Sequence, residues 1–482
     1  MTNKISASDI EAHHLETDSW TVVNGKVYNV TQFAKEHPGG AGVIYKYAGR
    51  DASKEYNRVH SPSLIAELED SYLGELDAST VPPKWTEDGK PQQSTRPDVE
   101  MYRKPPLQHI INLSDFEDVA IQTLSPKSWA YNSGAANDNI TRDANQTMFQ
   151  HIWLRPAVMR DVSSVTTESV LFGCKLNIPV YIAPVGAAKS VCSDGELSPA
   201  RAANASGITQ CIATTASYTL TEILNETPES AFLQVYINKD RAKTESQIRQ
   251  AAQSRKVKAL FITADLPVMS KREADERIRP EGEGLVVSIN QGSREEGKGS
   301  VGLAKSNSSF IDPSLNWNDI AWLRGITDLP ILVKGVQRVE DAQLAMRYGL
   351  DGIVISNHGG RAADTAPPSI LTLLEIQRYC PEAAERMTIL VDGGFRRGSD
   401  IVKAVCLGAS AVGLGRPFTY ALCYGEAGIA HAVQVIKHEI ETAMQLVGLT
   451  SLSQCHPRYL NTSYLDSLIS PNYGRSQPNA KL

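Results

Sequence analysis

A histidine and an arginine stand three residues apart in the segment SNHGGR. His358 follows the apolar run GIVISN directly, and two glycines separate it from Arg361. A histidine titrates near neutral pH and can take a proton from a substrate, while an arginine can hold a carboxylate through two parallel hydrogen bonds. The pair therefore indicates a base beside an anion-binding group, which suits an anionic hydroxy acid.

Three further charged residues follow other apolar runs. Lys334, in LPILVKGVQ, places a fixed cation where negative charge would develop during a reaction. Asp265, in FITADLP, can hydrogen-bond a catalytic histidine and stabilise its charged form, and Arg272 follows as a second anchor for a carboxylate. A structural salt bridge would explain Lys334 or Asp265 alone equally well, so the prediction rests on the whole set.

Two segments rich in glycine and arginine predict a phosphate site. DGGFRRG covers residues 392–398 and GLGRP covers residues 413–417. Backbone N–H groups and arginines in such positions commonly bind a phosphate at the end of a barrel, although glycines alone would be weak support. No GxGxxG motif follows a first strand, which disfavours a nicotinamide dinucleotide in a separate domain.

A different site is predicted near the N-terminus. His37 begins HPGG, whose proline and glycines favour a turn that leaves the imidazole projecting, and His60 lies in YNRVHSPS. Two imidazoles can bind a haem iron on both faces and leave no position open for oxygen, so such a site carries electrons. Either histidine alone would more often be an ordinary surface residue.

The elements that must position these residues are apolar runs rich in β-branched side chains. Eight such runs alternate with helix-length segments, as a closed parallel barrel of the TIM (β/α)8 type requires. A doubly wound open sheet is the competing architecture, but it does not need eight evenly distributed strands. The runs are 179–186, 208–216, 231–237, 259–265, 330–336, 352–358, 388–394 and 411–417. Residues 279–308, rich in glycine and charge, predict a mobile loop over the barrel mouth.

Composition divides the chain into four parts. Residues 1–77 mix strand and helix signals, including a hairpin at Asn24-Gly25, and predict a small α+β haem domain. The proline-rich residues 78–108 predict a hinge. The α/β barrel is expected over residues 109–460 and a C-terminal tail over 461–482.

Bulk composition excludes some partners. A net charge of −6 over 482 residues offers no basic surface for a nucleic acid. Residues 1–80 hold twelve Asp and Glu against seven Lys and Arg, which favours encounter with a basic partner, although a solvated acidic surface explains most such imbalances. No run of about 18 apolar residues appears, so no membrane span is expected.

The cysteines and the N-terminal sequence bear on the compartment. The seven cysteines are odd in number and form no CxxC pair, which predicts buried thiols in a reducing compartment. The first residues lack an apolar signal core and the Arg-rich character of a transit peptide. We therefore expect a cytoplasmic protein, with the mitochondrial intermembrane space as the alternative if a presequence has been removed.

Taken together, the motifs resemble two known families over about residues 10–460. WTVVNGKVYNVTQFAKEHPGG with the second histidine resembles cytochrome b5, whereas SNHGGR, VDGGFRRG and GLGRP resemble the FMN-dependent L-2-hydroxy-acid dehydrogenase and oxidase family. The resemblance implies haem b bound by His37 and His60, and FMN bound in the barrel. It also implies a catalytic base, His358, supported by Asp265.

The resemblance assigns roles to the remaining candidates. Substrate would be held or polarised by Tyr131, Tyr236, Arg272 and Arg361. The implied flavin-binding set is Gly186, Gln234, Thr263, Lys334, Ser356, Asp392, Gly394, Arg396, Gly415 and Arg416, with the last two glycines and both arginines at the phosphate.

Three departures from the family pattern bear on the pocket. Gly186 stands where relatives that use lactate or glycolate generally have alanine, and Thr215 replaces a bulkier residue. The larger pocket predicts a longer or aromatic acid such as mandelate, because each buried methylene contributes about 0.8 kcal/mol. Ala213 replaces a flavin-contacting serine, at a cost of about 0.5–1.5 kcal/mol, and Ala135 replaces the usual glycine near Tyr131.

The sequence thus predicts FMN-dependent oxidation of an L-2-hydroxy acid, such as L-lactate or L-mandelate, to the 2-keto acid. Electrons would pass to the haem and then to cytochrome c, and a homotetramer is expected. Two alternatives stay open, an oxidase that uses oxygen and a non-catalytic flavohaem module for electron transfer or sensing. The second is disfavoured because His358, Arg361, Asp265, Lys334 and Tyr236 are all present.

Overall fold

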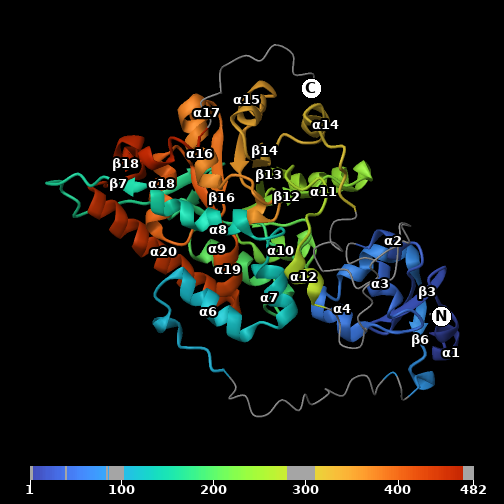
Figure 1. Ribbon diagram of the computed structural model, residues 1–482. Coiled ribbons are helices and arrows are strands. Elements are labelled where there is room, and N and C mark those ends of the chain that lie inside the picture. Colours follow the sequence, from blue (N-terminus) through green and yellow to red (C-terminus); the bar gives the residue numbers. More distant parts are fainter. Residues whose placement is uncertain (1–3, 38–40, 83–84, 86–101, 279–309, 470–482) are drawn as a thin grey trace, which may run out of the picture.

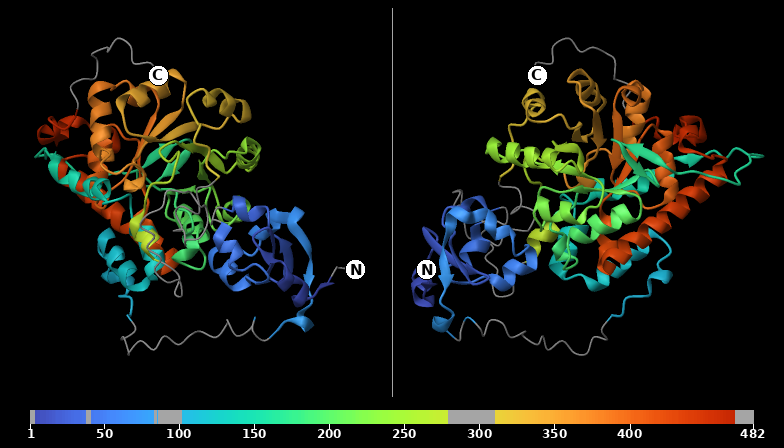
Figure 2. Two further views of the ribbon diagram at one scale, coloured as in Figure 1. Left: turned by 45° about the vertical axis from the view of Figure 1, so that its right-hand side comes forward. Right: turned by 180° about the vertical axis from the view of Figure 1, so that it is seen from behind.

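The computed structural model contains a small N-terminal domain beside a larger barrel (Figure 1). It describes residues 4–37, 41–82, 85, 102–278 and 310–469. The loop predicted at 279–308 lies outside the described residues, as does the end of the predicted C-terminal tail. Figure 2 shows the two domains from two further sides, with the N-terminal domain in blue.

The N-terminal domain is built on a six-stranded sheet with short helices against it. The strands are β1 (Lys4–Ile5), β2 (His14–Leu15), β3 (Asp18–Val23), β4 (Lys26–Asn29), β5 (Arg50–Asp51) and β6 (Tyr72–Leu76), in the order β1-β6-β4-β3-β2 with β5 beside β3. The helices are α1 (Ala7–Ala12), α2 (Phe33–Glu36), α3 (Ala41–Tyr45) and α4 (Ser53–Val59). The predicted hairpin joins β3 to β4, where Asn24 and Gly25 adopt φ of 53° and 78°, as an Asn-Gly turn of this kind requires.

Apolar residues cover both faces of this small sheet. Ile10, Val22 and Val27 are fully buried on one face. On the other face, Val23 and Tyr28 form a second cluster with Val30, against which Ile44, Tyr56 and Ile65 pack. The second cluster lies on the side of the sheet from which α4 leads to His60.

The larger domain is a closed barrel of eight parallel strands, which confirms the predicted TIM architecture. The strands are β10 (Val180–Ile182), β11 (Thr209–Ile212), β12 (Ala231–Val235), β13 (Val257–Thr263), β14 (Ile331–Val336), β15 (Gly352–Ile355), β16 (Thr388–Asp392) and β17 (Ala411–Leu414). Each strand pairs with the next, and β17 closes the ring onto β10. Polar residues at the carboxyl ends of the strands therefore meet over one mouth.

Side chains fill the barrel interior. Tyr181, Phe232, Phe261, Leu332 and Val354 are fully buried in one cluster inside the ring. A hairpin formed by β8 (Ser169–Leu171) and β9 (Cys174–Leu176) packs into the same cluster just ahead of β10, and so covers the end of the barrel opposite the mouth. The barrel is thus a packed core rather than a pore, and its chemistry is confined to the mouth.

Helices surround the ring of strands. Those that follow the strands are α9 (Leu197–Ala205), α10 (Leu220–Glu226), α11 (Arg241–Gln253), α12 (Glu273–Arg277), α14 (Asp319–Ile326), α15 (Val339–Arg347), α16 (Ser369–Tyr379), α17 (Ala383–Arg386), α18 (Gly398–Cys406), α19 (Arg416–Ala421) and α20 (Gly425–Val447). Before the barrel come α6 (Leu113–Thr123), α7 (Pro126–Ser133), α8 (Ile140–Thr147) and the short strand β7 (Trp153–Leu154), which pairs with β18 (Leu460–Asn461). Within the part of the chain that the structure describes, no helix has both the length and the apolar character needed to cross a membrane.

Candidate active site

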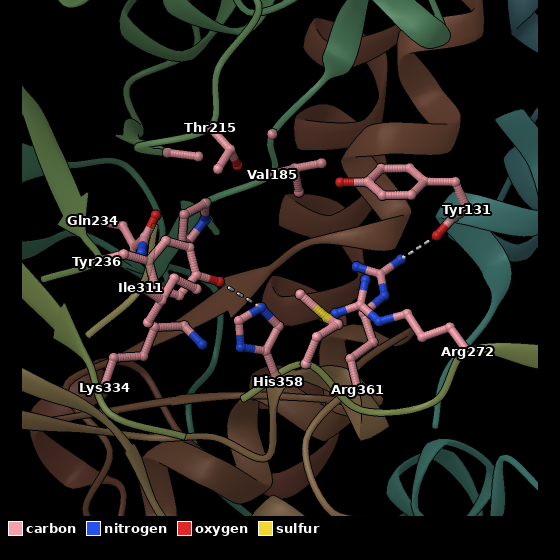
Figure 3. Close-up of a pocket in the computed structure, with 14 residues that line it drawn as sticks. Tyr131, Val185, Thr215, Gln234, Tyr236, Arg272, Ile311, Lys334, His358 and Arg361 are labelled. Atoms are coloured by element: carbon pink, nitrogen blue, oxygen red, sulfur yellow. Dashed lines mark hydrogen bonds between the residues drawn. The ribbon is translucent and has the colours of Figure 1, made fainter. Parts of the chain in front are cut away.

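One cavity at the barrel mouth gathers most of the residues that the sequence singled out. Figure 3 shows their side chains facing a common space. They come from several different strand ends and from the segment before the barrel, so the closed ring, and not proximity in the sequence, assembles the site. The lining residues are Tyr131, Pro184, Val185, Gly186, Ala213, Thr215, Gln234, Tyr236, Met269, Arg272, Ile311, Lys334, His358 and Arg361.

His358 is held in one orientation by hydrogen bonds on both ring nitrogens. Its Nδ1 lies 2.9 Å from Oδ1 of Asp265, and its Nε2 lies 3.4 Å from the hydroxyl of Tyr236. Because a carboxylate only accepts, Nδ1 carries the proton and Nε2 presents a lone pair to the cavity. The backbone of His358 has a φ of 59°, a left-handed conformation that is uncommon for non-glycine residues.

Burial and charge oppose each other at this histidine. Burial lowers the pKa of His358 below its usual 6.5, and the charge of Asp265 only partly restores it. Burial alone would raise the pKa of the Asp265 carboxyl, but the nearby His358 and Lys334 outweigh it and lower that pKa. At neutral pH the pair is thus a neutral imidazole beside a carboxylate, the protonation state that a general base needs.

A pH profile tests this assignment. We expect kcat/KM to fall as the pH drops through a value below 6.5, because protonation of His358 removes the base. Asp265→Asn should move the acidic limb to still lower pH, since it removes the charge that raises the pKa of His358. Profiles of flavin reduction for both proteins would measure the limb, and a limb at or above pH 6.5 in the unmodified protein would contradict the assignment.

Lys334 is a buried cation of the site, only 4% exposed. Its Nζ lies 3.8 Å from Asp265 and 3.6 Å from Asp392, and it donates to Ser356 Oγ at 3.0 Å. Burial works against its charge, but Asp392 and Asp265 outweigh that effect and raise the pKa of Lys334. Ser356 in turn donates to Asp392 at 2.6 Å and accepts from the backbone N–H of His358 at 3.0 Å. The cation and the base are therefore joined through one hydrogen-bonded network.

Arginines form the opposite wall of the cavity. Arg272 is 6% exposed, and its Nε has no hydrogen-bond partner among the described residues. Burial and the nearby Arg361 lower the pKa of Arg272 to about 10. Two guanidinium groups that face each other in this way favour an anion between them, since an anion would relieve both the repulsion and the unsatisfied donor.

A third arginine and Arg361 hold the same turn of backbone. Arg361 donates to the carbonyl oxygens of Tyr131, Asn132 and Gly134, and Arg416 donates to those of Asn132 at 3.2 Å and Gly134 at 2.9 Å. Burial, with Arg361 next in weight, lowers the pKa of Arg416 to about 9. The positive charges of Arg416 and Arg361 thus lie close together, and this position also favours a bound anion.

Comparisons with known proteins decide the family. The FMN-dependent dehydrogenase model matches residues 120–462, and the cytochrome b5-like haem/steroid binding domain matches residues 6–77. The chain belongs to the FMN-dependent dehydrogenase family. FMN and haem are therefore its cofactors, as the sequence predicted.

Individual relatives of this FMN-dependent dehydrogenase span both domains or the barrel alone. L-lactate dehydrogenase (cytochrome) from Wickerhamomyces anomalus is 39% identical over 469 residues, which cover 96% of this chain and 80% of the relative. Spinach (Spinacia oleracea) glycolate oxidase is 36% identical and covers 72% of this chain and 94% of its own. A mutant flavocytochrome b2 with benzoylformate matches with a TM-score of 0.68 at 36% identity, over 78% of this chain and 94% of the other. Mandelate oxidase matches with a TM-score of 0.63 at 33% identity, over 73% of this chain and 98% of its own.

The residues around the barrel mouth fit FMN. Gln234 donates to Thr263 at 2.9 Å and accepts from the backbone N–H of Thr214, so both predicted ring contacts are fixed beside Lys334. Gly394 has a φ of 85°, and a Cβ there would lie 2.1 Å from the backbone oxygen of Asn145, so only glycine fits this position. The turn at Gly394 lies in the same segment as Arg396, and Arg416 comes from the neighbouring strand end. The two arginines offer positive charge to a dianionic phosphate.

The N-terminal histidines fit the haem of this FMN-dependent dehydrogenase. The rings of His37 and His60 have centroids 6.1 Å apart at an interplanar angle of 79°, and His37 is 8% exposed. Burial, then the nearby His37 and Lys189, lower the pKa of His60 to about 4, which keeps its imidazole in the neutral form that binds iron. The two rings are thus close enough to share one iron atom.

The structure separates the sequence-predicted residues into two groups. Tyr131, Gly186, Gln234, Tyr236, Arg272, Lys334, His358 and Arg361 line the cavity. The others, Thr263, Asp265, Ser356, Asp392, Gly394, Arg396, Gly415 and Arg416, lie behind or beside it and contact the lining residues or the neighbouring turns.

Sequence reasoning missed several residues of the site. The apolar lining of Val185, Met269 and Ile311 carries no chemical signal in the sequence. Asn357 and Asn145 form a fully buried pair, with two hydrogen bonds of 2.9 Å between their side-chain amides. Asn357 also accepts from the backbone N–H of a glycine in SNHGGR, so its place inside that motif was the one available signal.

Proposed function

We propose that this chain oxidises an L-2-hydroxy acid to the 2-keto acid and delivers the electrons through its haem to cytochrome c. The observation that carries the proposal is that His358, hydrogen-bonded from behind by Asp265, lies opposite Arg272 and Arg361 in one cavity. Bound FMN would supply the oxidising chemistry by accepting two electrons from the substrate. The relatives named L-lactate dehydrogenase (cytochrome), which extend over both domains, support the use of haem as the next carrier.

The side chains divide the work of the reaction. Arg272 and Arg361 bind the substrate carboxylate, which places its hydroxyl-bearing carbon in front of His358. The Nε2 lone pair of His358 accepts a proton, and Asp265 stabilises the resulting imidazolium. The hydroxyl of Tyr236 points at the same nitrogen and polarises the substrate oxygen. Lys334 offers the fixed positive charge for the flavin ring.

The cavity suits a substrate larger than lactate. Gly186 and Thr215 both line it, and Thr215 packs against the position that a Cβ at residue 186 would take, so the proposed extra space comes from the small Thr215 side chain, where the family pattern has a bulkier one. Two solved relatives hold aromatic acids, a mutant mandelate oxidase with (S)-mandelic acid and a mutant flavocytochrome b2 with benzoylformate, and they support an aromatic 2-hydroxy acid such as L-mandelate as substrate.

Gly186→Ala tests the size of the pocket. A Cβ at this position would lie 2.1 Å from Oγ1 of Thr215 and 2.6 Å from its carbonyl oxygen, so the loop must shift. We expect a loss of about 1–3 kcal/mol in stability and a fall of about tenfold or more in kcat/KM for L-mandelate relative to L-lactate. Thr215→Ala in the same chain removes the closest contact and should restore part of both. An unchanged substrate ratio in the single variant would contradict the proposed pocket.

The electron acceptor follows from charge. The acidic surplus of residues 1–80 supports a basic partner, and cytochrome c is the partner we propose. Stopped-flow mixing with L-lactate and L-mandelate tests the whole route: flavin should bleach first, haem should be reduced next, and added cytochrome c last. A haem that stays oxidised while the flavin bleaches, with hydrogen peroxide formed at the rate of substrate loss, would indicate an oxidase instead.

Assembly and compartment are part of the proposal. Trp153, Val158, Met159 and Leu446 expose 67%, 83%, 98% and 71% of their surface on the β7 segment and the end of α20, two segments that a backbone hydrogen bond joins. Exposed apolar residues of this kind support self-association, and we propose a homotetramer. Sedimentation velocity would measure its mass. The seven free cysteines, five of them buried, support a reducing compartment, and we propose the cytoplasm. Cell fractionation would test that placement.

A further inference from the structure

A lysine of the barrel binds the end of the helix that leads to His60. The Nζ of Lys189 donates to the carbonyl oxygens of Asn57 and His60, at 2.8 Å each. These carbonyls stand at the C-terminal end of α4, where helices leave acceptors unpaired and carry partial negative charge. The lysine thus pairs a full positive charge with the turn that holds one of the two haem ligands.

A carboxylate of the barrel binds the next residues of the same turn. Oε1 of Glu222 accepts from the hydroxyls of Ser61, at 2.6 Å, and Ser63. The backbone N–H of Ser61 donates to the carbonyl oxygen of Ser217 at 2.8 Å. Ser61 is only 1% exposed, so these bonds lie within the contact between the domains. Residues 57–63 are therefore held to the barrel by charges of both signs.

Two of the barrel residues that make these bonds, Lys189 and Ser217, belong to the loops that line the active-site cavity, and Glu222 lies on α10, which follows the second of these loops. Lys189 follows Gly186 by three residues, and Ser217 follows Thr215 by two. Glu196 joins the two loops to each other. Its buried carboxylate accepts from the backbone N–H of Ala188 at 2.9 Å and from that of Ser217 at 3.0 Å. The haem-ligand turn is thus attached to the outer side of the same two loops whose inner side faces the substrate.

We propose that Lys189 and Glu222 hold the turn of residues 57–63 against the barrel, and that this contact sets how fast electrons cross from the flavin to the haem. The inference rests on the proposed function. Contacts between domains of one chain commonly open and close, so a charge-assisted pair at the haem ligand itself determines how long the docked state lasts. Both residues act as positioning residues and contact neither the base nor the carboxylate anchors.

The first test compares Lys189→Met with the unmodified holoenzyme. Without substrate, we expect hydrogen exchange of the backbone amides in residues 57–63 to become faster by about tenfold or more, because two hydrogen bonds from a charged donor are lost. After mixing with a 2-hydroxy acid, flavin reduction should stay within about twofold of the unmodified protein, while haem reduction slows by about tenfold or more. The ferric haem takes one electron from the reduced flavin and becomes ferrous; once it has passed that electron to cytochrome c, a second transfer reoxidises the flavin, whose protons pass to solvent.

Two further variants keep the test decisive. Lys175→Met removes an exposed lysine of β9 at the far end of the barrel, and it should change neither exchange nor haem reduction. Changing Ser61 and Ser63 together to alanine removes the two hydroxyls of the haem domain that donate to Glu222. This variant should show the same faster hydrogen exchange of residues 57–63. The proposal is overturned if both the lysine variant and the serine variant exchange at the unmodified rate, or if haem reduction keeps pace with flavin reduction in both. If the unmodified flavin is not reduced by any 2-hydroxy acid, the proposed function fails instead, while the exchange measurement still tests the contact.

Discussion

Replacing His358 with glutamine is expected to slow flavin reduction by about 10²- to 10⁴-fold, the range that a positioned general base contributes. Glutamine is close in size and can still hydrogen-bond Asp265, but it cannot take up a proton. Because His358 contacts Asp265 and Tyr236 and not the phosphate turn, both cofactors should stay bound. Single-turnover absorbance of the flavin under anaerobic conditions measures the effect directly.

A matched control separates the base from a general effect of losing a histidine. His438 is an exposed residue on α20, far along the chain from the barrel mouth, and His438→Gln should leave flavin reduction unchanged. Flavin reduction in His358→Gln at the unmodified rate, with FMN fully bound, would remove His358 from the role of base.

Replacing Lys334 with methionine should lower both activity and stability. Methionine preserves most of the length and removes the charge, which leaves the buried Asp265 and Asp392 without their shared cation. Breaking such a buried pair costs about 3–5 kcal/mol, and removing a preorganised charge from the site slows the reaction by about 10²- to 10³-fold. Thermal unfolding and the rate of flavin reduction measure the two effects.

The comparison variant for this experiment is Lys437→Met. Lys437 lies on α20 and makes a 3.8 Å pair with Glu441 while 43% exposed, so its loss should change neither quantity measurably. Equal behaviour of the two lysine variants would show that Lys334 has no special electrostatic role.

The barrel could be predicted from the sequence because its strands are buried on both sides. Such strands appear as near-continuous apolar runs, and the polar residue that ends each run marks the carboxyl end of the strand. Lys334 and His358 were found in this way. Asp265 was found by the same signal, although it lies behind His358 rather than in the cavity wall.

Other parts of the site could not be predicted because they depend on contacts between distant segments. Met269 and Ile311 look like ordinary core residues, and only the closed ring turns them toward the substrate. Ser61, Lys189 and Glu222 are common surface residue types, and no local pattern indicates that they meet across two domains. The sequence thus carried the chemistry of the strand ends but not the packing that surrounds it.

The turn at residues 132–134 connects two ends of the active site mechanically. Arg361, at the proposed substrate end, and Arg416, at the proposed phosphate end, both donate to the carbonyl oxygens of Asn132 and Gly134. An anion that attracts one guanidinium would weaken the hydrogen bonds of that arginine to the shared turn. The other arginine would then hold the turn alone. Because both arginines hold the same turn, we expect the binding of flavin and the binding of hydroxy acid to be coupled.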